Sequence, residues 1–151
     1  MDNKSKLIDF AEHLKQADGL LITAGAGMGV DSGLPDFRGD NGFWTAYTPF
    51  QRLGKSFIDV ATPQLFYTEP KLAWGFYGLR LNQYREVIPH NGFHLLKQWT
   101  ETLPNLKHGS FVFTSNVDGE FQKVEFDDDQ VFECHGSIHW LQCLDNCMQA
   151  I

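Results

Sequence analysis

The residues of this sequence that could do chemistry fall into four short stretches, and the first is a glycine-rich turn. Gly25, Ala26 and Gly27 follow the apolar run 20–23, which favours a buried strand ending in a tight turn. Such a turn between a strand and a helix presents backbone N–H groups and the positive end of a helix dipole, so it predicts a phosphate site. A turn that serves packing alone is the alternative, because the dinucleotide fingerprint G-x-G-x-x-G would need a glycine at Val30.

The second stretch is a polar turn that follows four β-favouring residues, 111–114. It contains Ser115, Asn116 and Asp118, which we expect at the carboxyl end of a strand. An amide side chain can orient a ribose or a water molecule, and a carboxylate can accept a hydrogen bond from a carboxamide N–H. The alternative is an Asx turn, in which Asn116 or Asp118 only bonds its own backbone.

The third stretch is 131–139, in which His135 is expected to follow a strand. Because imidazole titrates near neutral pH, His135 could take a proton from a ribose hydroxyl under physiological conditions. A lone histidine after a strand is more often structural. We keep that interpretation for His139, which has no chemically suggestive neighbours.

The fourth stretch is a cysteine pair, Cys143 and Cys147, with three residues between its members. This spacing allows two thiolates to bind one Zn²⁺, and a structural zinc ion needs four ligands, so the second pair would have to come from further sequence. With Cys134 the chain has three cysteines. An odd number fits a metal site in a reduced compartment better than a disulfide framework, which predicts a cytoplasmic protein.

Regular elements must position these stretches. Apolar residues recur on one helical face over 5–17, and a strand and the glycine loop follow, which is the opening of an α/β domain with its ligand at the end of the first strand. Residues 40–103 are rich in aromatic residues and are interrupted by prolines. We expect a helical insertion here, whose aromatic residues either line a cleft or form a small core. Arg80 and Arg85 are expected at the surface or in salt bridges.

The composition excludes several classes of partner. The chain has 151 residues, of which 42% are hydrophobic and 21% charged, so it can form one globular core. A formal net charge of −7 provides no electrostatic footprint for nucleic acid or for an anionic membrane. No apolar run is long enough to span a bilayer, and there is no signal-peptide pattern.

Three motifs together resemble the sirtuin family: GAGMGVDSGLPDFRG begins at Gly25, TSNVDG at Thr114 and ECHGS at Glu133. The resemblance implies an α/β fold with a Rossmann-like parallel sheet, a helical insertion and the start of a small zinc-binding module. We expect these parts at 1–39 with 104–136, at 40–103 and at 137–151, respectively. Sirtuin catalytic domains continue with a second cysteine pair and further strands, so we expect a fragment or a truncated product with an incomplete sheet.

The resemblance also implies NAD and Zn²⁺ as cofactors and assigns residues to them. We expect the NAD diphosphate along Gly25, Ala26 and Gly27, and the nicotinamide ribose under Asp36, Phe37 and Arg38. The nicotinamide end should be lined by Ser115, Asn116 and Asp118. The expected catalytic residues are His135 and Asn116, and the expected zinc ligands are Cys143 and Cys147. Two positions depart from the family pattern, because Gly29 stands where the family usually has serine and Ser115 where it has glutamine.

The function that the resemblance implies is NAD-dependent removal of acyl groups from protein lysines, which releases nicotinamide and O-acyl-ADP-ribose. The expected partner is an acylated lysine of a protein or peptide. Two alternatives stay open: NAD glycohydrolysis or ADP-ribosyl transfer, which needs the same nicotinamide pocket, and a non-catalytic fragment that only binds NAD or zinc.

Overall fold

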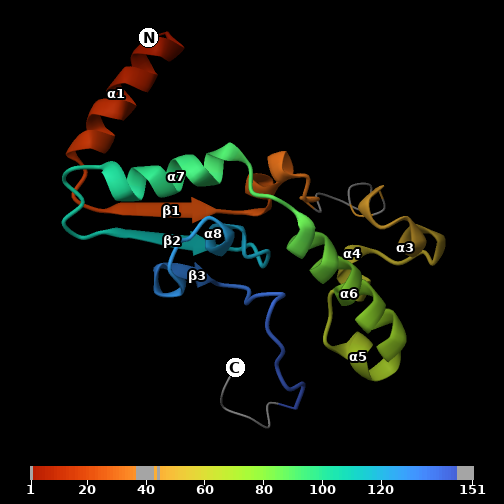
Figure 1. The fold of residues 1–151 in the computed structure, drawn as a ribbon. Coiled ribbons are helices and arrows are strands. Elements are labelled where there is room, and N and C mark those ends of the chain that lie inside the picture. Colours follow the sequence, from red (N-terminus) through yellow and green to blue (C-terminus); the bar gives the residue numbers. More distant parts are fainter. Residues whose placement is uncertain (1, 37–42, 44, 146–151) are drawn as a thin grey trace.

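A three-stranded parallel sheet organises this protein, as a computed structural model of residues 2–36, 43 and 45–145 shows (Figure 1). The strands β1 (Leu20–Ala24), β2 (Ser110–Thr114) and β3 (Val131–Glu133) pair in that order. Leu20 lies opposite Ser110, and Val112 lies opposite Val131. Parallel neighbours need long crossover connections, and here the crossover between β1 and β2 contains most of the helices. The predicted α/β fold with a Rossmann-like sheet is therefore confirmed.

The helices form two groups. The helices of the first group precede or follow the strands directly in the sequence. They are α1 (Asn3–Gln16), the 3₁₀ helix η1 (Ala26–Ser32), α7 (Asn91–Thr102), α8 (Glu120–Lys123) and the 3₁₀ helix η2 (Asp128–Gln130). The others are α3 (Thr48–Arg52), α4 (Phe57–Val60), α5 (Gln64–Thr68) and α6 (Pro70–Glu86). In Figure 1 this second group lies beyond the carboxyl ends of β1 and β2. The helical spacing seen over 5–17 corresponds to α1, and the helical insertion expected over 40–103 contains α3, α4, α5, α6 and α7.

One face of the sheet is buried and the other is exposed. Ile22 and Val112 point into a cluster with Phe93 of α7 and Phe121 of α8. On the opposite face, side chains of all three strands are 42–66% exposed within the described chain: Leu21, Phe111, Phe113 and Phe132. Helix α7 lies within 40–103, the range expected for the insertion, but it packs on the sheet. The division of the chain into a sheet part and an insertion that ends at 103 stays a prediction.

The second group of helices has a core of its own. Phe43, Tyr47, Phe50 and Phe76 contact one another in tilted or edge-to-face pairs, with ring centroids 5.4–6.4 Å apart. Offset and edge-to-face pairs of this kind stabilise a core beyond the area that they bury. A capping box begins α4, in which Ser56 and Asp59 exchange hydrogen bonds. The aromatic residues therefore specify a compact helical layer rather than a loose loop.

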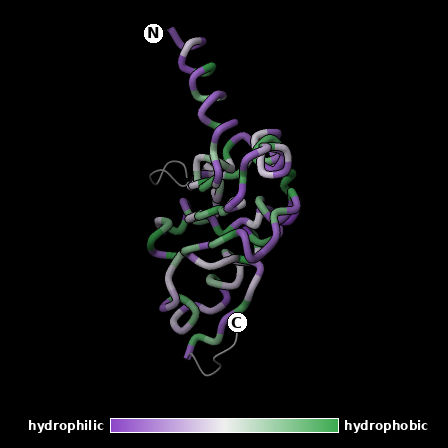
Figure 2. Tube along the Cα trace, turned by 90° about the vertical axis from the view of Figure 1, so that its left-hand side faces the viewer, coloured by the Kyte–Doolittle hydropathy of each residue, from purple (hydrophilic) through white to green (hydrophobic). Residues whose placement is uncertain are grey.

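Helix α1 projects from the rest of the described chain, as Figures 1 and 2 show from two directions. It has no buried residue, and its ring contact with the body is Phe10 against Trp99, with centroids 6.2 Å apart. Asp2 caps its first turn by accepting a hydrogen bond from the Ser5 backbone N–H at 2.7 Å. None of the helices described combines the length and the apolar character that crossing a bilayer requires.

Candidate active site

The glycine turn after β1 and the polar turn after β2 lie side by side and are joined by hydrogen bonds. The Asn116 side chain donates through Nδ2 to the Gly25 carbonyl at 3.1 Å. The Ser115 backbone N–H donates to the Ala24 carbonyl at 3.1 Å. Asn116 is 7% exposed, so its amide is held in one orientation. Parallel pairing brings the carboxyl ends of both strands to the same edge of the sheet, where ligands collect in open α/β folds.

Asp118 is a buried carboxylate whose position is fixed by two neighbours. Its Oδ1 accepts a hydrogen bond from the Glu120 backbone N–H at 3.0 Å, so the Asx turn weighed above is present at this residue. Its carbonyl accepts from Nε2 of His139 at 2.8 Å. Burial raises the pKa of Asp118, while the Glu120 N–H and the nearby charge of Lys123 lower it. One carboxylate oxygen is thus committed to the turn.

A cavity of about 660 Å³ opens at this edge of the sheet. Five of the predicted site residues line it: Ala26, Ser115, Asn116, Asp118 and His135. Its other walls come from α4, α5 and α6 and from the segment 137–144. Volumes of this order are typical of small-molecule sites.

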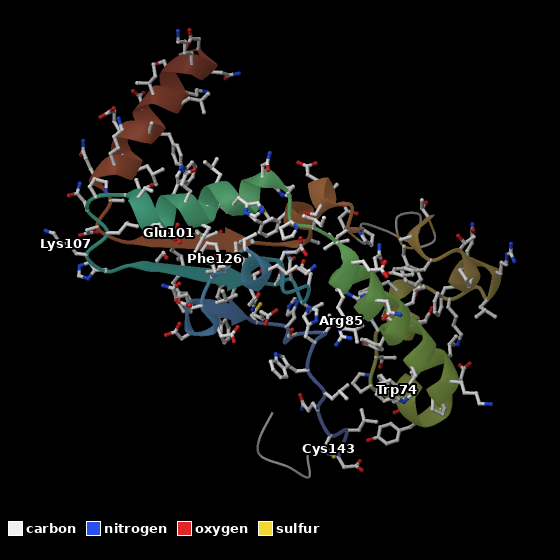
Figure 3. All side chains as sticks on the ribbon, viewed as in Figure 1. Trp74, Arg85, Glu101, Lys107, Phe126 and Cys143 are labelled. Carbon is white, nitrogen blue, oxygen red and sulfur yellow. The ribbon has the colours of Figure 1, made fainter. Side chains whose placement is uncertain are left out.

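The segment after β3 is tied to the helices across the cavity. The Tyr67 hydroxyl of α5 donates to Oδ1 of Asp145 at 2.9 Å. Ile138 donates its backbone N–H to the Val117 carbonyl at 3.0 Å, which anchors the start of the same segment to the polar turn. Figure 3 shows Cys143 on this segment at the same end of the molecule as Trp74 of α6. The cavity therefore lies between the sheet edge and the helical layer.

Not every predicted site residue lines the cavity. Gly25 and Gly27 belong to the same turn as Ala26 but are not among the lining residues, and Asp36 lines a second cavity of about 520 Å³. Cys143 stands between Gln142 and Leu144, which do line the first cavity. Three predicted residues, Phe37, Arg38 and Cys147, lie outside the described residues.

Arg80 is the main residue that sequence reasoning misplaced. Expected at the surface or in a salt bridge, it is only 6% exposed and lines the cavity. Its Nη2 donates to the Tyr84 hydroxyl at 2.8 Å, and its guanidinium lies over the Phe57, Phe76 and Tyr84 rings. Cation–π contacts make this burial tolerable. Its spacing from Ala73, Phe76 and Tyr84 puts Arg80 on one face of α6, but this spacing does not show the rings that surround its guanidinium. Arg85 is exposed, as expected.

The aromatic residues of the insertion divide between the two roles considered for them. Phe43, Tyr47, Phe50 and Phe76 belong to the core of the helical layer. The cavity is instead lined by a second set: Phe57, Phe66, Trp74, Tyr77 and Tyr84. Helical spacing alone could not separate the two sets, because Phe57, Phe66 and Tyr77 line the cavity and also pack against the core.

Comparison with known proteins decides the family. A model of the Sir2 family matches residues 25–151. The chain belongs to the Sir2 family. Among curated relatives, it is 32% identical over 138 residues to an NAD-dependent protein deacylase of Candida albicans and 30% identical over 140 residues to the mitochondrial NAD-dependent protein deacylase sirtuin-5 of Danio rerio. These matches cover 91% and 93% of this chain, and 42% and 43% of the relatives.

Solved Sir2 structures show the same arrangement. A triple mutant of a Sir2 homologue in complex with 2′-O-acetyl ADP-ribose has a TM-score of 0.70 at 27% identity, with 95% of this chain and 50% of that chain covered. A complex of a Sir2 homologue with NAD has a TM-score of 0.66, with 91% and 46% covered. The chain thus spans about half the length of the relatives that it matches.

One departure of this Sir2 chain from the family pattern has a packing reason. Gly29, which stands where a serine is usual, is buried in η1. A Cβ atom at this position would lie 3.1 Å from Cδ1 and 3.3 Å from Cβ of Leu34. Leu34 is itself only 5% exposed, so it has little room to move. The glycine therefore lets the loop after η1 pack closely against η1.

Proposed function

We propose that this Sir2 chain forms part of an enzyme that uses NAD to remove acyl groups from protein lysines. The observation that carries the proposal is the composition of the 660 Å³ cavity. One end has the amide of Asn116, the carboxylate of Asp118 and the imidazole of His135, and the other walls are mainly aromatic and aliphatic. A polar end beside an apolar channel suits a dinucleotide that reacts with an acyl-lysine side chain.

The residues around the cavity fit the nicotinamide half of NAD. Ala26 brings the backbone of the glycine turn to the cavity wall, where a side chain larger than methyl would fill space that a diphosphate needs. The second oxygen of Asp118 would accept a hydrogen bond from a carboxamide N–H. When bound, NAD supplies a ribose carbon from which nicotinamide can leave. Asp36, Phe37 and Arg38 are proposed to lie over the nicotinamide ribose, and Ser115 to contact the ribose.

His135 is proposed as the general base. It is exposed at the cavity, one residue beyond Cys134, whose backbone N–H donates to the Thr114 carbonyl at 2.9 Å. The imidazole can take a proton from a ribose hydroxyl. Asn116, held by the Gly25 carbonyl, would orient the ribose or a water molecule. Rings such as Phe57 and Trp74 exclude water from the acyl group.

A zinc site is proposed at Cys143 and Cys147. Cys143 has intermediate exposure, and thiolate is the preferred zinc ligand in structural sites. Within the described residues, no group of three or more potential ligands is assembled, so further ligands are needed. The cytoplasmic location indicated by the cysteine content stays a prediction.

The test measures nicotinamide release from NAD by the full-length protein that carries this chain, with and without an acetyl-lysine peptide. We expect release to depend on the peptide and the peptide to lose its acetyl group by mass spectrometry. His135→Ala should lower deacylation by the roughly 10²- to 10⁴-fold typical of general-base removal, with a smaller effect on nicotinamide exchange. Release that ignores the peptide would indicate glycohydrolysis, and NAD binding without any release would indicate a non-catalytic role.

A further inference from the structure

Lys123, at the end of α8, makes contacts that the proposed chemistry does not use. Its ammonium group donates to the carbonyls of Tyr84 and Val87 and to Oε1 of Glu120, the last two at 2.6 Å and 2.9 Å. Lys123 does not line the cavity. It joins two segments that are 36–39 residues apart in the sequence.

The two carbonyls lie at the carboxyl end of α6, which ends at Glu86. The last carbonyls of a helix have no partner within it and form the negative end of the helix dipole. An ammonium group placed there donates hydrogen bonds to these carbonyls and interacts favourably with the negative end of the dipole. Lys123 supplies this group from a distant segment. The junction between α6 and α7 is held on its other side as well, because the His90 N–H donates to Oγ of Ser32 at 3.0 Å.

Glu120 holds the ammonium group of Lys123 next to the end of α6. This side chain is completely buried, and its Oε1 accepts from Lys123, while Oε2 has no hydrogen-bond partner among the described residues. Burial raises the pKa of Glu120, and the hydrogen bond and charge of Lys123 lower it. A buried charge whose partner is removed is strongly destabilising, so each member of the pair keeps the other in position.

The pair connects two walls of the cavity. α6 contributes Tyr77, Arg80 and Tyr84 to one wall, and the polar turn just before α8 contributes Asn116 and Asp118 to the facing one. Tyr84 of α6 and Asp118 of the polar turn line this one cavity, so the two walls enclose the same space. The separation of these walls must therefore depend on how the end of α6 is attached to α8.

We propose that Lys123 is a positioning residue, which attaches the carboxyl end of α6 to the segment carrying Asn116 and Asp118 and so fixes the two cavity walls relative to each other. The effect on ligand binding rests on the proposed NAD site, whereas the attachment itself does not. Two separate readouts can therefore distinguish a failure of one from a failure of the other.

The experiment compares Glu120→Gln with the double variant Glu120→Gln/Lys123→Met. Both lack the buried carboxylate, so neither leaves that charge without its partner, and they differ only in the side chain at position 123. Hydrogen–deuterium exchange over residues 84–90 measures the attachment, and calorimetric titration with NAD measures the binding site. Lys15→Met is the control, because Lys15 is an exposed lysine on α1.

We expect Lys15→Met to behave like the parent chain and Glu120→Gln to keep the contacts of Lys123 with α6, because the glutamine side-chain oxygen can still accept the Lys123 hydrogen bond. The double variant should exchange faster over 84–90 and bind NAD roughly tenfold more weakly, the loss of about one charge-assisted hydrogen bond. Glu120→Gln/Lys123→Arg should recover both, because the guanidinium keeps the donors. If the double variant does not fold, Glu120→Gln/Lys123→Gln replaces it.

Unchanged hydrogen–deuterium exchange in the double variant would overturn the proposal. Faster exchange with unaltered NAD affinity would overturn it as well, because Lys123 would then have a purely structural role. If the parent chain itself does not bind NAD, the proposed function fails, and tryptophan fluorescence, to which the cavity residues Trp74 and Trp140 contribute, then takes the place of calorimetry. In that case an emission spectrum shared by the double variant and Glu120→Gln would contradict the positioning role.

Discussion

Replacing Gly119 with alanine tests how the polar turn is held. Gly119 has a left-handed conformation, with φ of +74°, between Asp118 and the start of α8. A Cβ atom here would lie 2.8 Å from Nε2 of His139, the same atom that donates to the Asp118 carbonyl. The substitution therefore strains the backbone and also displaces the histidine ring that fixes Asp118.

The two costs can be estimated separately. A left-handed conformation costs a non-glycine residue about 1–2 kcal/mol. Loss of a hydrogen bond such as that from His139 to Asp118 costs about 0.5–1.5 kcal/mol. Gly119→Ala should therefore lower the free energy of unfolding by about 1.5–3.5 kcal/mol. Gly109→Ala is the matched control, because Gly109 has φ of +68° and no described atom within 4 Å of an added Cβ.

Urea unfolding of the two variants measures the difference. We expect Gly119→Ala to be the more destabilised, and we expect the excess to disappear when His139 is replaced by alanine in both. Carbon NMR of the Asp118 carboxyl should show that its pKa rises in Gly119→Ala, because the His139 charge that lowers it has moved away. Equal destabilisation of Gly119→Ala and Gly109→Ala would refute the reasoning.

Three further changes test other parts of the molecule. Gly27→Val should abolish NAD binding in calorimetry while the circular dichroism spectrum stays unchanged, since a branched side chain would occupy the space of the diphosphate. Burial and the Asp118 charge raise the pKa of Glu133 above its ordinary 4.5, so its contribution to stability is fully present below pH 4.5 and is lost as the pH rises through the raised value. Glu133→Gln should therefore flatten the decline of the unfolding free energy between pH 4.5 and neutral pH, and an unchanged slope would contradict this. Ser56→Ala removes the capping box of α4 and should lower the free energy of unfolding by about 0.5–2 kcal/mol, as measured by urea unfolding.

Local sequence was sufficient for the elements and for the edge where the site lies. The helices α6 and α7 and the strands β1 and β2 follow from periodicity and β-propensity, which depend on neighbouring residues. Parallel pairing then requires the turns after β1 and β2 to meet. That is why the amino-acid sequence is enough to group Ala26, Asn116 and Asp118 at one site.

Contacts between distant segments could be known only from the tertiary structure. Arg80 is buried because three rings from α4 and α6 surround its guanidinium, and Lys123 acts on carbonyls that precede it by more than thirty residues. The sequence by itself determined the family motifs, the α/β fold and the polar end of the cavity, since these depend on short-range patterns. The folded chain alone decided which aromatic residues line the cavity and which charges are buried, because burial is set by packing between elements that no local pattern encodes.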